Sequence, residues 1–238
     1  MCIRDRTIRE PQRKIQESES IEVPSFSKVI QYIKNNWEVY GAIIIGNSCL
    51  IILLYGLQSW VPTMLLRVYE WDLVQSGRVY GSIAMLAGSA GVLSGPFVLK
   101  YMSKINVNAP HFKLAIFGIS MASLSLVLLP FQPNVNIALV FVTMASFFVT
   151  LPLAGTSSAM VIVSPNRIRG VITGIYVVVT SVFGLVLGPF LVASSTDFIF
   201  QDTNAVAKSL ALVSILVGPI GIFFMFKGIN SFGEIKNV

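Results

Sequence analysis

The feature that most constrains this chain is the length of its stretches without a charged residue. Between Glu38 and Arg67 stand 28 consecutive uncharged residues, and 21 more separate Arg78 from Lys100. A helix rises 1.5 Å per residue, so about 20 apolar residues cross a hydrocarbon core of roughly 30 Å. The chain is 54% hydrophobic and only 12% charged, whereas soluble domains are about 25% charged. An all-α integral membrane fold is therefore predicted.

Six membrane-spanning helices follow from these gaps. The longest gap encloses 53 residues between Lys113 and Arg167, which is enough for two helices. Its turn sequence, 130–136, contains two prolines and two asparagines, and it marks the division. The predicted helices cover residues 39–66, 78–99, 114–130, 137–163, 170–196 and 208–227.

A further helix is predicted before the first span. The apolar residues of 25–37 recur at helical spacing, whereas Lys28 and Lys34 lie off that stripe. This pattern is typical of a short amphipathic helix on the membrane interface, although a plain extension of the first span fits as well. The expected organisation is a charged cytoplasmic linker at 1–24 (1–6 of artefactual origin), the interfacial helix at 25–37, a six-helix bundle at 38–229 and a cytoplasmic tail at 230–238.

The distribution of Lys and Arg predicts the orientation. With six spans, 14 of the 17 basic residues lie on the side of the two termini, and only Arg67, Arg78 and Lys208 lie opposite. Cytoplasmic loops carry the excess of Lys and Arg, so both termini are expected in the cytoplasm of a cell whose inner or plasma membrane holds the protein. Because these residues are spread over loops, nucleic-acid binding is not expected. The predicted cytoplasmic loops include Lys100, Lys104, Arg167 and Arg169.

Small residues recur at steps of three and four in two of the predicted spans. In lipid there is little hydrophobic drive between helices, and small residues let backbones approach closely. These positions serve static packing, gating or both. They are Gly88, Gly91 and Gly95 in the second span, and Gly170, Gly174, Gly184, Gly188 and Pro189 in the fifth.

Three segments resemble the second half of a major facilitator superfamily transporter. The charged opening "REPQRK" before an interfacial helix resembles the linker between that family's two six-helix halves, in its spinster-like members above all. The segment Gly91–Lys104 lies where each half has a Gly-x-x-x-Asp-Arg/Lys-type loop, although Leu99 stands at the acidic position. The segment Asn166–Phe200 resembles the fifth helix of the second half.

This resemblance implies a function and a partner. Such transporters bind a solute between two bundles that rock against each other. The chain is expected to be the second half of a secondary transporter for a small organic solute, and its N-terminal six-helix half is expected to be missing. A self-sufficient half-transporter or channel that acts as a dimer is the alternative.

The resemblance also implies that the first and fourth spans face the substrate cavity. Each of these spans carries a row of polar residues at helical spacing, and polar groups in hydrocarbon are costly unless they are partnered. Hydrogen bonding between helices, or from a hydroxyl to its own helix, is the alternative explanation. The candidates are Asn47, Tyr55 and Gln58 in the first span, and Thr143, Ser146 and Thr150 in the fourth.

Enzyme chemistry is not expected. The segment Gly155–Ala159, "GTSSA", is faintly similar to the serine motif of intramembrane proteases, but a general base is needed beside such a serine. The one histidine, His111, is expected in a loop outside the spans. No residues cluster in a metal-ligating pattern, so neither a metal nor a cofactor is predicted. The expected partners are the lipid bilayer, a small-molecule solute and the missing half.

Overall fold

The described part of the chain is helical along almost its whole length. A computed structural model describes residues 26–236, with side chains for 26–229 and Phe232, so the expected linker lies outside the described residues. The helices are α2 (Phe26–Asn35), α3 (Trp37–Val68), α4 (Leu73–Ile83), α5 (Ser89–Lys104), α6 (Pro110–Leu128), α7 (Val135–Thr150), α8 (Leu153–Val163), α9 (Arg169–Ser194) and α10 (Val206–Lys236).

Within residues 26–236, six helical segments are long and apolar enough to cross a membrane, which confirms the predicted fold class. π-helical turns at Ala84–Gly88 and Ser195–Phe200 join α4 to α5 and extend α9, and a 3₁₀ turn at Leu129–Phe131 ends α6. The spans are Trp37–Val68, Leu73–Lys104, Pro110–Phe131, Val135–Val163, Arg169–Phe200 and Val206–Ile229.

Several spans are longer than the uncharged gaps from which they were predicted. The second begins at Leu73, where the Asp72 side chain accepts a hydrogen bond from the Val74 amide at 3.0 Å and caps the helix. Arg78, where the uncharged gap begins, is an exposed residue inside α4. A long basic side chain near a helix end reaches the interface while its backbone stays helical, so a charge does not mark the end of the helix.

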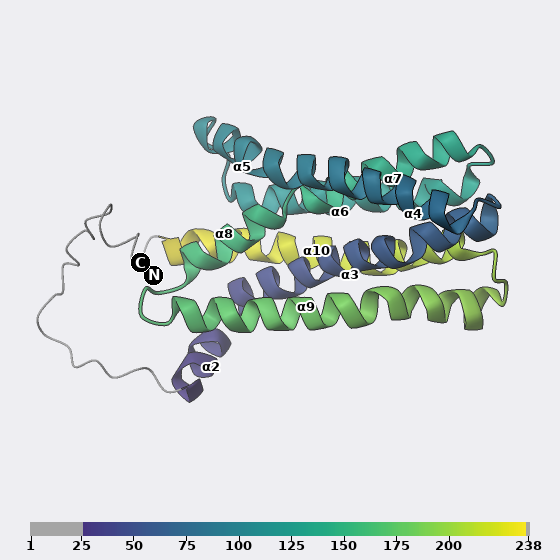
Figure 1. Ribbon diagram of the computed structural model, residues 1–238. Coiled ribbons are helices and arrows are strands. Elements are labelled where there is room, and N and C mark those ends of the chain that lie inside the picture. The colour runs from purple at the N-terminus through teal and green to yellow at the C-terminus, as the bar shows by residue number, and fades with distance from the viewer. Residues whose placement is uncertain (1–25, 237–238) are drawn as a thin grey trace, which may run out of the picture.

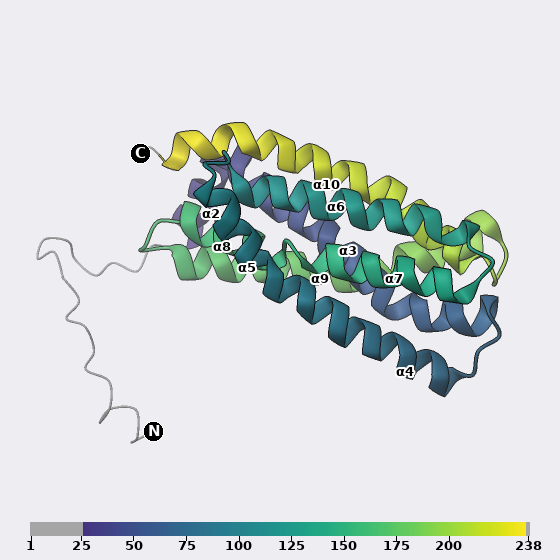
Figure 2. The ribbon, with the colours of Figure 1, turned by 90° about the horizontal axis from the view of Figure 1, so that it is seen from above.

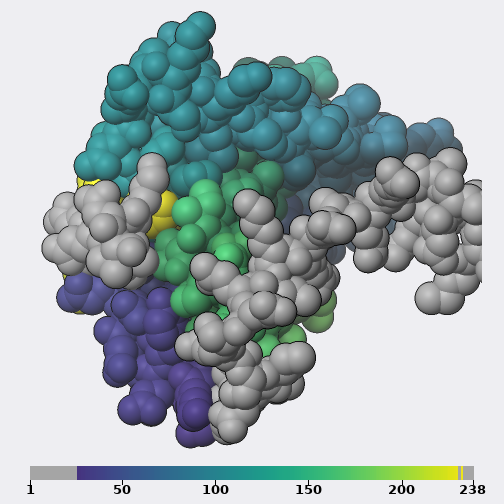
Figure 3. Space-filling model, turned by 90° about the vertical axis from the view of Figure 1, so that its left-hand side faces the viewer, coloured from purple at the N-terminus to yellow at the C-terminus, as the bar shows by residue number. Residues whose placement is uncertain are grey.

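Helix α3 runs through the middle of the bundle (Figure 1). It packs along α9 and α10, α10 packs on α6, and α6 packs on α7. Helices α4 and α5 pack on α7, on the other side of α3 from α9 (Figures 1 and 2). The spans alternate in direction, so α3, α6 and α9 begin at the end where α5 and α8 finish. We call this end, which carries Lys104, Lys113 and Arg169, the basic end; Figure 3 views the molecule from it.

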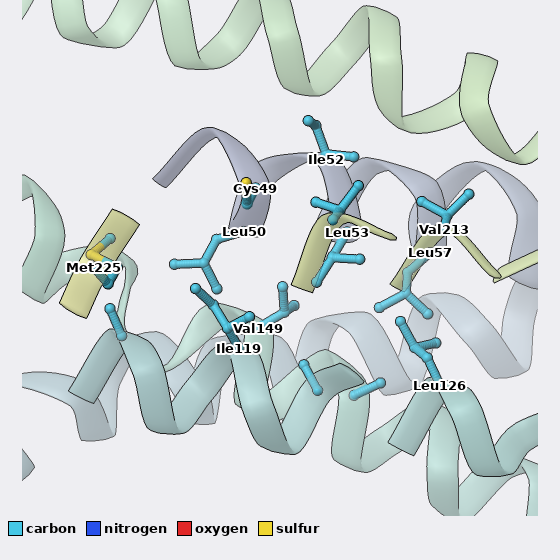
Figure 4. Close-up of a cluster of buried hydrophobic side chains, with 14 of the residues drawn as sticks. Cys49, Leu50, Ile52, Leu53, Leu57, Ile119, Leu126, Val149, Val213 and Met225 are labelled. Atoms are coloured by element: carbon cyan, nitrogen blue, oxygen red, sulfur yellow. The ribbon is translucent and has the colours of Figure 1, made fainter. Parts of the chain in front are cut away.

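The core lies between α3, α6, α7 and α10 (Figure 4). Leu50 and Leu57 of α3 and Ile119 of α6 are fully buried there. Close approach is possible because α10 presents glycine: a Cβ built on Gly221 would lie only 2.9 Å from Cβ of Cys49. The bundle is therefore held by apolar packing around small residues, as expected for helices in lipid.

At the end of the bundle opposite the basic end, a hydrogen bond joins two of the segments that connect the helices. Just after α3, the Tyr69 hydroxyl donates to the Gln132 carbonyl at 2.8 Å and joins two connecting segments. Burial raises the pKa of the Tyr69 hydroxyl, because the charged phenolate is disfavoured away from water. The hydroxyl therefore remains a protonated donor across the physiological pH range.

Candidate functional site

The fourth span is interrupted in its middle. Helix α7 ends at Thr150 and α8 begins at Leu153, with Pro152 between them. Proline has no N–H, so the Phe148 carbonyl loses the donor that a regular helix would place four residues later. Irregular backbone at membrane depth is tolerated only where protein or a water-filled cavity surrounds it, and broken helices form the substrate sites of many transporters.

Three glycines from neighbouring helices cover this break. A Cβ built on Gly118 of α6 would lie 2.7 Å from the Phe148 oxygen, and one on Gly91 of α5 would lie 2.5 Å from the Phe147 oxygen. Gly95 of α5 approaches the Leu151 oxygen equally closely. Only a glycine Cα–H fits against a carbonyl at this separation. Gly91 and Gly95 were predicted as packing positions, whereas Gly118 was not.

The residues after the break each contact a different helix. The Gly155 oxygen accepts a hydrogen bond from Nδ1 of His111 in α6, at 3.0 Å. The Thr156 hydroxyl donates to Oδ1 of Asn47 in α3, at 2.7 Å. The Ser157 hydroxyl lies 3.4 Å from the Tyr176 hydroxyl of α9. The "GTSSA" segment is therefore a junction that joins α8 to α6, α3 and α9.

Sequence reasoning missed most of this junction. His111 was placed in a loop, but it lies in the first turn of α6, because Pro110 is well suited to begin a helix. Thr156 and Tyr176 were not singled out. The available signal was the "GTSSA" segment itself, with three consecutive hydroxyl residues after a proline break. The ring of His111 contacts the Gly155 carbonyl oxygen, so this contact ties α6 to α8.

The predicted row on the first span is divided between two interfaces. Asn47 is 2% exposed and faces α8, whereas Tyr55 packs at α9, with its Cβ 3.2 Å from a Cβ built on Gly188. Gln58 is exposed. The three residues therefore do not line one open surface in this structure. The prediction treated α3 as having one polar face, but Asn47 and Tyr55 face two different helices, α8 and α9.

Two of the hydroxyls predicted on the fourth span bond their own helix. Thr143 donates to the Leu139 oxygen at 2.7 Å, and Thr150 donates to the Ser146 oxygen at 2.9 Å. The Ser146 hydroxyl is buried beside Tyr80 of α4, without a well-formed hydrogen bond. Hydrogen bonding to their own helix, the alternative explanation, is thus present for Thr143 and Thr150, and their place on a cavity face stays a prediction.

The glycines of the fifth span fall into two groups. Gly184 and Gly188 pack tightly on α3, against Ile51 and the backbone at Gly56 respectively. The Pro189 oxygen, beside them, accepts a hydrogen bond from Trp60 Nε1 of α3 at 3.0 Å.

Gly170 and Gly174 lie elsewhere on α9. A Cβ built on either residue would meet nothing within 4 Å in the described chain, so the predicted packing role is not fulfilled inside this bundle. Gly88 of the second span makes only an ordinary contact, 3.9 Å from Thr150 Cγ2.

The predicted loop residues gather at the basic end. Lys100, Lys104 and Arg167 are exposed. Arg169 donates from Nε and Nη2 to the Ser164 oxygen at 3.3 and 3.2 Å. This contact fixes the turn between α8 and α9 beneath the junction.

Some polar side chains within the membrane-spanning segments are exposed. In Figure 1 the ribbons of α3 and α8 run between α4 and α5 on one side and α9 on the other, and we call the exposed polar positions of these two helices the polar strip. Gln58 of α3 and Ser157 of α8 are both exposed on these helices. Among the described residues, no group of His, Cys, Asp and Glu is placed to hold a metal. The strip can offer uncharged hydrogen-bond donors and acceptors.

Solved structures with the same fold come from transporters. A bacterial homologue of the human lysosomal transporter Spinster, inward-facing and unoccupied, aligns with a TM-score of 0.71 at 14% identity. The alignment covers 96% of this chain and 55% of that one. The inward-facing, occupied form aligns with a TM-score of 0.57 at 14% identity, over 84% of this chain and 49% of that one. At this identity the likeness is one of fold, and the chain spans about half the length of these structures.

No curated protein matches the chain. The family profile described as the Major Facilitator Superfamily matches residues 4–189, which is more than half of the chain. The predicted resemblance is therefore confirmed, and this chain belongs to the major facilitator superfamily.

Proposed function

We propose that the chain is the second six-helix half of a secondary transporter that moves a small organic solute by alternating access. Family membership supports transport, and the coverage of about half of each solved relative supports a half-length unit. In this proposal the polar strip of α3 and α8 faces the solute, and a first six-helix half closes the pathway from the other side.

The observation that carries the proposal is the uneven burial of the spans. In the most apolar window of α3, 72% of the residues are buried, whereas the value is 28% for the α4–α5 span and for α9. These two sparsely buried spans flank the polar strip. A sister bundle that docks on α4, α5 and α9 would leave the strip between them as an enclosed pathway.

Within this pathway Gln58 and Ser157 are the proposed solute contacts, because both are polar, uncharged and exposed. Asn47 would support this site by holding α8 to α3 through its hydrogen bond with Thr156, the neighbour of Ser157. Neither α3 nor α8 carries a charged residue between Glu38 and Arg67 or between Leu153 and Val163. An ionic group for a charged solute or for proton coupling would come from the first half.

The basic end is proposed to face the cytoplasm. It holds the exposed Lys100, Lys104 and Arg167, while Arg67, Arg78 and Lys208 stand at the other end. An excess of Lys and Arg marks the cytoplasmic side of membrane proteins. The membrane would accordingly be the inner or plasma membrane, with α2 lying along its cytoplasmic surface.

Thiol labelling tests the proposed pathway. Gln58→Cys and Ser157→Cys would be made in the chain co-produced with a first six-helix half, in a background without the native cysteines. Phe223→Cys on α10, an exposed apolar position, is the lipid-facing control. A membrane-impermeant maleimide is expected to label the first two variants at least about tenfold faster, because a wetted pathway delivers the reagent. Equal rates at all three positions would refute the pathway.

A further inference from the structure

An apolar groove of about 450 Å³ separates α5 from α6 near the basic end. Val98 and Met102 of α5 form one wall, Leu114 and Phe117 of α6 form the other, and α7 contributes Phe148. The rings of Phe117 and Phe148 meet edge to face at 5.6 Å. The volume lies in the range of about 300–1,000 Å³ that is usual for small-molecule pockets.

Only two of the groove's side chains are polar. The hydroxyl of Ser94 already donates to the Gly91 oxygen at 3.0 Å, so it has no need of a ligand. The other is Lys113, which lies in the first turn of α6 at the mouth of the groove. Both walls belong to membrane-spanning helices, so the medium that meets this groove is lipid hydrocarbon.

Lys113 is the charged side chain among the residues that line the groove. It is exposed, and its ammonium has no hydrogen-bond or ion-pair partner among the residues that the structure describes. A lysine near the end of a span extends to the headgroup layer. There an ammonium attracts phosphate, and basic pockets between spans bind the headgroups of anionic lipids.

We propose that the groove between α5 and α6 binds an anionic glycerophospholipid, with an acyl chain along the apolar walls and the headgroup phosphate on Lys113. Charge complementarity and membrane depth favour this occupant over a protein partner. The residues that line the groove come from α5, α6, α7 and the break after α7, and none belongs to α3 or α8. The proposal therefore stands independently of transport.

The bound chain would also stabilise this corner of the bundle. Leu99, Leu114 and Leu151 form a small buried cluster that is separate from the main core. Few side chains therefore hold α5 to α6 at this level, and an acyl chain would add contacts with both helices. Lipid binding is accordingly expected to raise the thermal stability of the chain.

Native mass spectrometry and thermal unfolding of the purified chain test this proposal, with phosphatidylglycerol and phosphatidylcholine as probes. Phosphatidylglycerol is expected to bind more tightly than phosphatidylcholine and to raise the unfolding temperature of the chain. Lys113→Gln is expected to weaken phosphatidylglycerol binding by about fivefold, since one basic residue near an anionic surface contributes about 1 kcal/mol. Lys113→Arg is expected to retain binding.

Two further variants distinguish lipid binding in the groove from attraction of lipid to general surface charge. Lys104→Gln removes an exposed lysine at the same end that does not line the groove, and it is expected to bind as the unaltered chain does. Val98→Trp fills the groove and is expected to reduce binding of both lipids. The proposal would be overturned if the two lipids bound equally well. It would also be overturned if Lys113→Gln or Val98→Trp left binding unchanged, or if Lys104→Gln weakened binding as much as Lys113→Gln does.

Discussion

The Thr156 hydroxyl of α8 donates to Oδ1 of Asn47 in α3 at 2.7 Å, across 109 residues of sequence. Both side chains are about 2% exposed. The bond ties the segment after the proline break to the most buried span of the bundle. A buried polar pair of this kind is stable only while both members are present, because loss of one leaves the other without a partner.

Replacing Thr156 with Val tests this bond while keeping the shape of the side chain. Thr156→Val is expected to lower the free energy of unfolding by about 0.5–2 kcal/mol, since hydrogen bonds between membrane helices average about 0.6 kcal/mol and an unpaired amide adds to the cost. Reversible unfolding in mixed micelles measures the change.

The control for this substitution is Ser158→Ala. The Ser158 hydroxyl is exposed and bonds the Ala154 oxygen in its own helix, so its loss is expected to change stability by less than about 0.5 kcal/mol. A double-mutant cycle with Asn47→Ala isolates the pair. A coupling energy near zero would show that the bond contributes nothing to stability.

The glycines around the break give the second prediction. Gly95→Ala places a methyl group against the Leu151 oxygen and is expected to destabilise the chain by about 1–3 kcal/mol. Gly81→Ala, in the same span, meets nothing within 4 Å and is expected to be neutral or to stabilise by up to about 1 kcal/mol, because alanine favours a helix. Thermal unfolding of the two variants compares them, and equal effects would contradict the close packing.

The sequence was sufficient to predict the number and order of the spans. A gap of 28 uncharged residues between Glu38 and Arg67 leaves no soluble alternative, and the α3 span runs from Trp37 to Val68. The predicted first and last residues of a span differ from those of the helix where a charged residue lies inside the helix. Arg78 in α4 and Asp197 in the π-helical turn after α9 are both exposed, and a charge that reaches solvent does not end a helix.

The junction was beyond sequence reasoning because it depends on pairs that are distant in sequence. Asn47 was chosen as a polar residue in an apolar span, but nothing local identifies Thr156 as its partner. For Thr143 the spacing suits a cavity face, and its hydroxyl also bonds the Leu139 oxygen of its own helix, a bond that spacing does not predict. Helical periodicity gives the direction of a side chain, while burial depends on which helix lies there.

The open glycines of α9 give a prediction about the sister bundle. Gly174→Leu adds a side chain where the described chain has nothing within 4 Å, so the stability of this chain alone is expected to change by less than about 0.5 kcal/mol. Co-purification with the proposed first six-helix half is expected to fall several-fold, because a small residue at a helix interface allows close approach. Undiminished co-purification would place this face against lipid.

Reporter fusions test the orientation. Green fluorescent protein joined after Val238 is expected to fluoresce, and alkaline phosphatase at the same point is expected to be inactive, because the basic end is proposed to be cytoplasmic. Fusions in the loop between α3 and α4, after Glu70, are expected to give the reverse result. Phosphatase activity at the chain end would reverse the proposed topology.

Solute uptake into liposomes tests the central claim most directly. Vesicles would hold this chain alone, the proposed first six-helix half alone, or both together, and accumulation of a panel of small organic solutes would be measured by mass spectrometry. We expect uptake of a solute only where both halves are present, and its loss when Gly174→Leu prevents pairing. Uptake by this chain alone, at the rate given by the two halves together, would contradict the account.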